Sequence, residues 1–280
     1  METLHPLNGM WVTVEGLNTY YLTRGSGKPV ILIHGLSAHS FSWRKNLDPL
    51  AKFFHVYALD LKGLGFSDKP LKSDYSPEGM ATFVIQFMDA LGIPEAALIG
   101  SSMGGMISLT AALKYPSRVT HLVLVASAGY PLPSNLLRKL LETPVLGEIL
   151  IKFAGKKDLE RGLRNCYYDS TQITPEVVEG YYLPYTRDRN LRPQLLMARR
   201  FGFHRPSPLE SLYNQIQIPT LLIWGREDRI VPIQHAYRFH REIKTSQLVI
   251  LEKTGHAPQE ENAKAFNKIV IDFLLSSGVR

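Results

Sequence analysis

A serine stands between a short apolar run and a helical stretch, with glycines two residues before it and two residues after it. The sequence there is Gly100-Ser101-Ser102-Met103-Gly104, preceded by the apolar run 96–99 and followed by the helical pattern 105–113. Strand, sharp turn and helix in this order are the setting in which a G-x-S-x-G pattern lifts a serine hydroxyl out of a sheet. The pattern therefore predicts an accessible, nucleophilic Ser102 at the end of a buried strand.

The remaining pattern alternates between strands and helices. The alternating stretches 11–14 and 19–22, joined at Gly16, predict an antiparallel hairpin. Apolar runs without alternation are typical of parallel strands covered on both faces, and they lie at 30–33, 56–59, 97–99, 122–125, 221–224 and 248–251. Helical patterns separate these runs, at 77–91, 103–114, 233–243 and 259–275. We expect an α/β protein with a mostly parallel, eight-stranded sheet and helices on both faces.

The interval 130–219 breaks this alternation, because it contains no clear strand pattern. Helical stretches occur in it near 134–142, 145–153, 156–166, 175–182 and 190–201, and prolines separate them. A run of helices inserted between two sheet strands predicts a helical cap. We therefore expect a core formed by residues 1–130 and 216–280 and a cap formed by residues 131–215.

Composition narrows the class of protein. The 280 residues are 45% hydrophobic and 20% charged, as in an ordinary globular protein, and no apolar run approaches the roughly 20 residues of a membrane span. Cys166 is the only cysteine, and the first residues lack the pattern of a secretory leader. We expect a cytoplasmic protein without stable membrane insertion. The sequence leaves its oligomeric state open.

The formal net charge of +7 is unevenly distributed. Residues 131–211 contain 13 Lys and Arg against 9 Asp and Glu. This surplus indicates either an ordinary solvated surface or attraction to an anionic substrate or membrane surface. Since no basic run is interleaved with aromatic residues, we expect no nucleic-acid partner.

Two loops supply the partners that a nucleophilic serine needs. His256 follows the last predicted strand, and Asp228 follows the strand before it, so both belong to the carboxyl edge of the sheet. A histidine accepts the serine proton, and a carboxylate orients the histidine. The order Ser102, Asp228, His256 is the one expected on this type of scaffold. Glu227 is an alternative to Asp228 as the orienting carboxylate.

The strand 30–33 ends in His34-Gly35-Leu36, which predicts the second half of an oxyanion hole. The backbone N–H of Leu36 would face that of Met103, and both would stabilise the developing negative charge. Phe41 and Trp43 follow shortly afterwards, and we expect them to line the substrate pocket. The histidines and single cysteine show no metal-binding spacing, so we predict neither a metal ion nor a cofactor.

Taken together, these motifs resemble the α/β-hydrolase fold superfamily, in its branch of capped serine hydrolases. The resemblance covers nearly the whole chain and is carried by Ile33-His34-Gly35-Leu36, by the run 60–70 (DLKGLGFSDKP), by Gly100-Ser101-Ser102-Met103-Gly104-Gly105, by Gly225-Arg226-Glu227-Asp228 and by Gly255-His256. It implies that Ser102 is the nucleophile, His256 the base and Asp228 the orienting acid. It also implies oxyanion N–H groups at Leu36 and Met103.

The resemblance also discriminates among reactions. Epoxide hydrolases and haloalkane dehalogenases carry aspartate where this chain has Ser102, and proline iminopeptidases usually carry tryptophan where it has Met103. Hydrolases that cleave carbon–carbon bonds of aromatic ring-fission products are similar around the serine. They typically have asparagine before it and tryptophan after the histidine, where this chain has Ser101 and Ala257. We therefore expect a carboxylic ester hydrolase, with a small-molecule ester of short to medium acyl chain as substrate. The alternatives are a meta-cleavage-type carbon–carbon hydrolase and a hydrolase-like receptor with little turnover.

Overall fold

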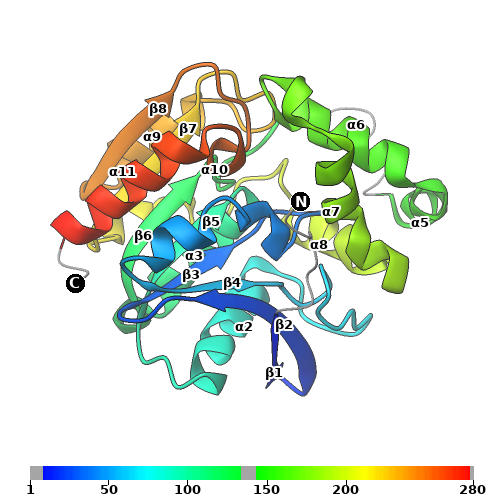
Figure 1. Cartoon of the computed structure of the whole chain (residues 1–280), viewed down its shortest axis with the longest axis horizontal. Coiled ribbons are helices and arrows are strands. Elements are labelled where there is room, and N and C mark those ends of the chain that lie inside the picture. Colours follow the sequence, from blue (N-terminus) through cyan, green and yellow to red (C-terminus); the bar gives the residue numbers. More distant parts are fainter. Residues whose placement is uncertain (1–8, 134–142, 278–280) are drawn as a thin grey trace.

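The computed structural model describes residues 9–133 and 143–277, and its centre is an eight-stranded sheet in the order β1-β2-β4-β3-β5-β6-β7-β8 (Figure 1). The strands are β1 (Met10–Val14), β2 (Leu17–Arg24), β3 (Pro29–Ile33), β4 (His55–Leu59), β5 (Ala96–Ser101), β6 (Val119–Val125), β7 (Thr220–Gly225) and β8 (Ser246–Leu251). Strand β2 pairs antiparallel with β1 and β4, and all other pairs are parallel. The predicted hairpin and the mostly parallel sheet are confirmed.

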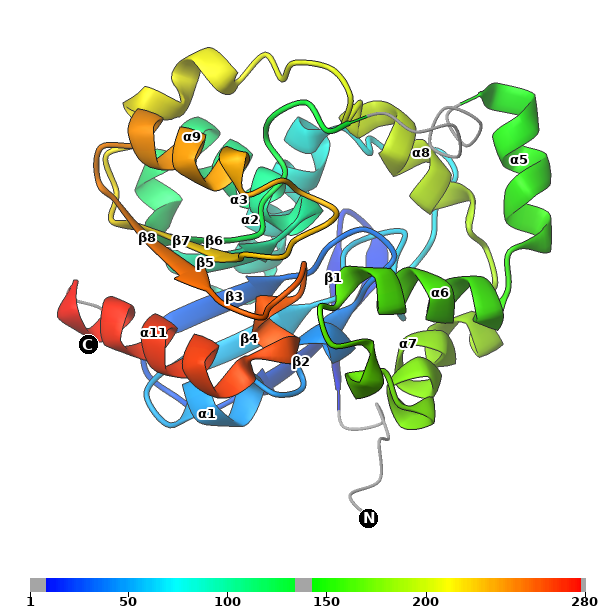
Figure 2. The same cartoon turned by 90° about the horizontal axis from the view of Figure 1, so that it is seen from above.

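Helices cover both faces of the sheet (Figure 2). Sheet side chains such as Ile31 and Leu98 pack into one apolar cluster with α2, α3 and α9, whereas their neighbours Val30 and Ile99 pack into a second cluster with α1 and α11. The helices of these two layers are α2 (Pro77–Ala90), α3 (Met103–Lys114), α9 (Gln234–Glu242), α1 (Leu47–Ala51) and α11 (Ala263–Ser276). Successive side chains of a strand point to opposite faces, so continuous apolar runs are what a sheet buried on both sides requires.

Short helical turns complete the connections within this layered part. They are η2 (Ser40–Trp43), η3 (Pro116–Arg118) and α10 (Pro258–Glu261). The sequence pattern predicted one helix over 259–275, whereas the structure divides it at Asn262, whose backbone is not helical (φ −124°, ψ 47°). The break allows α10 to contact η2 and β7 while α11 packs along the sheet.

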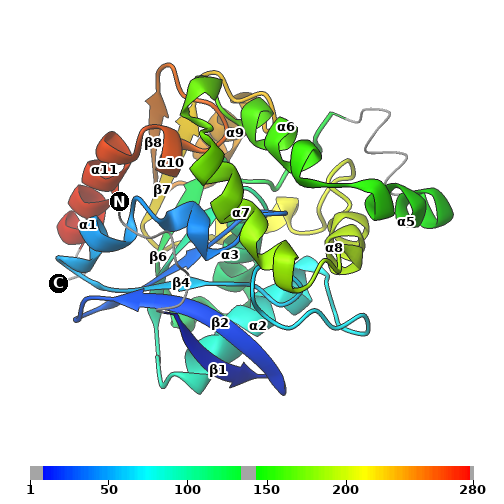
Figure 3. The ribbon, with the colours of Figure 1, turned by 45° about the vertical axis from the view of Figure 1, so that its right-hand side comes forward.

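The interval between β6 and β7 contains no strand among its described residues. It forms α5 (Pro144–Phe153), α6 (Lys156–Cys166), η4 (Ser170–Gln172), α7 (Pro175–Arg187), α8 (Arg192–Phe201) and η5 (Glu210–Gln215). Helices α5, α6, α7 and α8 lie together beside the carboxyl end of the sheet (Figures 1 and 3), whereas η5 packs against α3 and α9. The helix expected at 134–142 lies outside the described residues.

Helix α7 differs from its expected range, 175–182, because it continues through Pro184 to Arg187. A proline inside a helix leaves the carbonyl four residues earlier without its usual N–H donor. That carbonyl belongs to Gly180, and the buried His39 of the sheet layer lies against the Gly180 backbone. The helix nevertheless continues past this position to Arg187.

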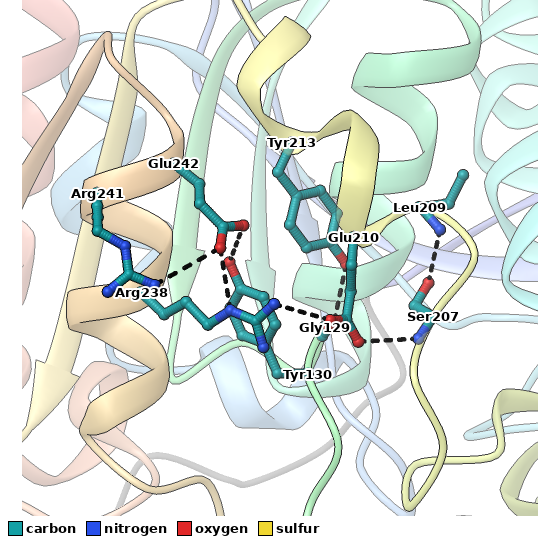
Figure 4. Close-up of polar contacts among 9 residues, drawn as sticks. All are labelled: Gly129, Tyr130, Ser207, Leu209, Glu210, Tyr213, Arg238, Arg241 and Glu242. Carbon is teal, nitrogen blue, oxygen red and sulfur yellow. Dashed lines mark hydrogen bonds and ion pairs between the residues drawn. The ribbon is translucent and has the colours of Figure 1, made fainter.

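A polar cluster joins both connections of the helical insertion to α9 (Figure 4). Tyr130, which follows β6, donates its hydroxyl to Glu242 at 2.8 Å. Arg238 lies over the Tyr130 ring, 4.0 Å from its centroid, and forms ion pairs of 3.0 Å with Glu242 and with Glu210 of η5. The segment that leaves the sheet and the segment that returns to it are thus fixed to the same helix.

Candidate active site

Ser102 occupies the sharp turn between β5 and α3. Its backbone has φ 55° and ψ −116°, a conformation that is costly for a residue with a side chain. Two hydrogen bonds hold it. The Ser102 N–H donates to the carbonyl of Val125, the last residue of β6 (2.9 Å), and the Ser102 carbonyl accepts the N–H of Ala128 in the segment that follows (3.0 Å). A Cβ at Gly104 would lie only 2.2 Å from the Ile33 carbonyl oxygen, so the turn can pack against β3 only with glycine there.

The structure brings Asp228 and His256 together. The His256 Nδ1 lies 2.8 Å from the Asp228 Oδ2, and the Asp228 side chain is fully buried. The other carboxylate oxygen accepts the backbone N–H groups of Ile230 (2.8 Å) and Val231 (2.9 Å). With Nδ1–H donated to the carboxylate, Nε2 is left as the proton acceptor.

Glu227, the alternative carboxylate, lies elsewhere. Its side chain accepts the Thr254 N–H at 2.9 Å and so braces the loop that leads to His256. The two acidic neighbours therefore have separate tasks. Asp228 contacts the imidazole, and Glu227 contacts the loop backbone.

Ser102 and His256 line the same cavity, of about 550 Å³, at the carboxyl end of the sheet. One wall comes from the sheet layer and includes Leu36 and Ala257, and the opposite wall comes from the helical insertion. Much of the surface is apolar, including Ile151, Ala154, Leu159, Leu163, Leu191, Leu195 and Ala198. A cavity of this kind can surround an apolar substrate next to the serine hydroxyl.

The residues expected to form an oxyanion hole lie on two adjacent turns. Met103 is the first residue of α3, where backbone N–H groups have no partner within the helix. The turn at Gly35 approaches Ser102 so closely that a Cβ on Gly35 would be 3.2 Å from the serine Cβ. Leu36 follows this glycine and lines the cavity. Both N–H groups thus come from turns that meet at the serine.

The His34 side chain connects the turn that carries Leu36 to the segment that follows β4. Its imidazole is fully buried, with Nδ1 2.8 Å from the Gly35 carbonyl oxygen and Nε2 3.1 Å from the Leu61 nitrogen. One ring nitrogen must donate and the other accept, so the imidazole is neutral. Burial lowers its pKa to about 4, which keeps it neutral at physiological pH.

Phe41 and Trp43 do not lie where the sequence pattern suggested, because neither is among the residues lining the cavity. The turn η2 directs Trp43 into the core, where it is fully buried against Phe266 of α11. Phe41 packs against α7, with its ring 5.4 Å from that of Tyr181, and is covered by Gly180. Both aromatic residues hold layers together rather than shape the pocket.

Sequence reasoning missed Glu260, which links the helical insertion to the loop carrying His256. This carboxylate is buried, forms an ion pair with Arg44 and accepts the Tyr181 hydroxyl at 2.5 Å. The insertion also reaches the His256 backbone directly, since the Cys166 carbonyl accepts the His256 N–H at 2.6 Å. Two adjacent glutamates four and five residues after the histidine are the signal in the sequence that could have indicated this contact.

Substitution of Glu260 by glutamine will lower the free energy of unfolding by about 3 kcal/mol, because the mostly buried Arg44 loses its counter-charge. Urea unfolding followed by circular dichroism measures the loss. The matched control is Glu252→Gln, which removes a carboxylate from an exposed ion pair with Arg226 and should lower the stability far less. Equal losses in the two variants would contradict this role of Glu260.

Acidification will destabilise the protein between about pH 6.5 and about pH 4. Burial lowers the pKa of both His34 and His39 from 6.5 to about 4. In this window the unfolded chain binds protons that the folded chain does not, so stability is lost as the pH falls and is fully present above about 6.5. Each histidine contributes about 3 kcal/mol to the loss. Urea unfolding midpoints measured between about pH 4 and about pH 6.5 report the loss of stability. The variant His39→Leu should show a weaker dependence of the midpoint on pH. An unchanged dependence would refute the role given to His39.

No cluster of three or more His, Cys, Asp and Glu side chains that could hold a metal ion occurs within residues 9–133 and 143–277. In the same residues, no helix is both long and apolar enough to cross a membrane.

Comparison with known proteins gives one consistent family. Residues 28–147 and 195–263 match a family described as the alpha/beta hydrolase fold. An uncharacterized hydrolase of Bacillus subtilis, YugF, is 32% identical over 98% of this chain and 100% of its own length. The 2-hydroxy-6-oxononadienedioate/2-hydroxy-6-oxononatrienedioate hydrolase of Comamonas testosteroni is 31% identical over 94% of each chain.

Two further similarities bear on the reaction. The monoacylglycerol lipase abhd6-A of Xenopus laevis is 29% identical over 96% of this chain and 83% of its own. Among solved structures, a meta-cleavage product hydrolase from Pseudomonas fluorescens IP01 superposes with a TM-score of 0.84 at 28% identity, covering 96% of this chain and 98% of that one.

Proposed function

Because this chain belongs to the alpha/beta hydrolase fold family, we propose that it is a serine hydrolase in which Ser102 attacks a substrate carbonyl. The observation that carries the proposal is the hydrogen bond between Asp228 and His256 in a cavity that His256 shares with Ser102. A serine hydroxyl is a weak nucleophile, and an oriented histidine is the base that activates it.

The mechanism then follows from these positions. His256 accepts the Ser102 proton as the hydroxyl attacks, and Asp228 stabilises the imidazolium that forms. The oxyanion lies between the N–H groups of Leu36 and Met103. Its collapse expels the leaving group, which takes a proton from His256, and water then hydrolyses the acyl-enzyme along the same route. We further propose that residues 131–215 act as a cap that closes the cavity over the substrate.

For the bond that is cleaved, the comparisons favour the carbon–carbon alternative over the ester hydrolysis expected from the sequence. The curated meta-cleavage hydrolases match this chain over nearly its whole length. In a vinylogous dioxo acid, attack of Ser102 on the ketone forms the oxyanion, and its collapse breaks the adjacent carbon–carbon bond. The leaving carbanion is stabilised as a dienolate and takes the proton that His256 accepted from Ser102. The same three residues therefore serve this reaction.

Arg189 supports an acidic substrate of this class. It is the only lysine or arginine among the described residues that line the cavity. It lies on the wall of the helical insertion and donates to the Ala154 carbonyl at 2.5 Å. A guanidinium in that wall can pair with the carboxylate at the far end of a dioxo acid while the ketone lies at Ser102.

Substitution of Arg189 by leucine will raise KM for a dioxo acid about tenfold, because one charge-assisted hydrogen bond is lost. KM for a neutral ester will not change. Steady-state kinetics with both substrates measure the two values, and Arg192→Leu, on α8 and not among the described lining residues, is the control. Equal effects on acid and ester would exclude a carboxylate contact.

Ester hydrolysis remains the second candidate, favoured by the apolar lining of the cavity and by the similarity to a monoacylglycerol lipase. The two candidates are distinguished by measuring turnover by the purified protein of 2-hydroxy-6-oxo-dienoates and, separately, of p-nitrophenyl esters from acetate to palmitate. We expect Ser102-dependent turnover of the dioxo acid to exceed that of every ester. Faster ester turnover would assign the ester class. Negligible turnover of both by folded protein would favour a ligand receptor.

A further inference from the structure

Helix α5 (Pro144–Phe153) presents a stripe of apolar side chains to solvent. Val145, Ile149 and Phe153 are 73%, 45% and 81% exposed, and Leu146 beside them is 36% exposed. Positions four residues apart lie on one side of a helix, so the first three form a continuous line. Figures 2 and 3 show α5 at the outer edge of the helical insertion, projecting away from the sheet. Single exposed apolar residues are common, but a whole helix face of them marks a contact surface.

The opposite side of this helix belongs to the substrate cavity. Ile151 lies in α5, and Ala154 is the first residue after the helix. Both line the cavity that contains Ser102. The exposed stripe and the cavity wall are therefore two sides of the same short segment. Whatever binds the stripe lies next to the substrate site.

Positive charge accompanies the stripe. Helix α5 packs against α8 (Arg192–Phe201), and together they contain four cations and one carboxylate, namely Lys152, Arg192, Arg199, Arg200 and Glu148. The carboxylate is already paired with Arg192 and Arg199. Lys157 follows at the start of α6, next to Lys156, which is paired with Glu179 of α7. The surface thus combines an apolar helix face with a surplus of cations.

We propose that this surface, formed by α5 with the adjoining cations of α8 and of the start of α6, docks the protein onto an anionic phospholipid bilayer. An amphipathic helix with basic neighbours lies in the plane of the lipid interface without spanning the membrane. The docked cavity would receive apolar substrate from the lipid, and this last step rests on the ester-hydrolase candidate of the proposed function. A second copy fits less well, because two equally basic surfaces repel each other and four side chains form too small an area for a stable dimer.

Vesicle co-sedimentation of the full chain tests the docking. We expect binding to phosphatidylcholine vesicles that contain phosphatidylglycerol, weakening with added salt, and at least about tenfold weaker binding to pure phosphatidylcholine. Phe153→Asp should weaken binding to the anionic vesicles about tenfold or more, and Lys152→Glu with Lys157→Glu should do the same. The matched control is Phe53→Asp, which changes an exposed phenylalanine of the sheet layer and should bind as the wild type does.

Three results would overturn the docking proposal. They are no binding to anionic vesicles, undiminished binding by Phe153→Asp, or a dimer in solution that Phe153→Asp dissociates. Hydrolysis of a water-soluble substrate without vesicles separates this proposal from the catalytic one. If Phe153→Asp retains that hydrolysis but loses vesicle binding, both proposals are supported. If the wild type binds vesicles but hydrolyses neither substrate class, only the catalytic proposal fails.

Discussion

Replacement of Ser102 by alanine will lower kcat by about 10⁵- to 10⁶-fold while the protein stays folded. The hydroxyl is the group that forms the covalent bond, and removal of a catalytic serine leaves only the contribution of binding and of the oxyanion N–H groups. We expect the turn to persist in the alanine variant, because the backbone hydrogen bonds that hold it do not involve the Ser102 side chain. Single-turnover kinetics with the preferred substrate measure the loss.

The neighbouring hydroxyl provides the matched control for this substitution. Ser101 also lines the cavity but ends β5 rather than occupying the turn. Ser101→Ala should keep kcat within about tenfold of the wild type, because its hydroxyl is given no part in the bond-making steps. If the two alanine variants lost similar activity, or if Ser102→Ala kept most of it, the assignment of the nucleophile would be wrong.

Replacement of Asp228 by asparagine will lower kcat by about 10⁴-fold. The carboxylate accepts Nδ1–H from His256 at 2.8 Å, and an amide in its place stabilises the wrong tautomer and cannot offset the charge of the imidazolium. The two backbone N–H groups that hold the other oxygen can still be satisfied by an amide oxygen, so we expect the fold to persist. The pH–rate profile and kcat are measured together.

Glu227 offers a control of equal charge in the adjacent position. Glu227→Gln removes a carboxylate that contacts the Thr254 backbone rather than the imidazole, and it should cost less than about tenfold in kcat. A larger effect at Glu227 than at Asp228 would reverse the roles of the two acids.

The layered fold was predictable because its signals are local. Continuous apolar runs identify strands that are buried on both faces, and Gly16, with φ 76°, marks the hairpin that the alternating stretches enclose. The turn at Ser102 was also readable from sequence, since glycines at 100 and 104 are required by backbone atoms only about 2.2 Å from where a Cβ would be. Asp228 and His256 follow consecutive parallel strands, β7 and β8, so their proximity at the carboxyl edge of the sheet was also predictable.

Side-chain direction was not predictable where a short turn sets it. Phe41 and Trp43 are two residues apart in η2, yet one packs on α7 and the other enters the core beside α11. Because both residues follow Leu36 closely in the sequence, we expected both to line the pocket. In a 3₁₀ turn, however, side chains two residues apart point in different directions. Likewise, the contact of Glu260 with Tyr181 joins residues 79 positions apart, and no local pattern reports such a pair.

Covalent labelling tests directly whether Ser102 is a nucleophile activated by His256 and Asp228. Purified protein is treated with a fluorophosphonate, and intact mass and peptide mapping then locate the adduct. We expect one adduct per chain, on Ser102, that is absent in Ser102→Ala and forms far more slowly in Asp228→Asn. No adduct on folded protein, or an adduct on another serine that lines the cavity, such as Ser42 or Ser101, would contradict this assignment.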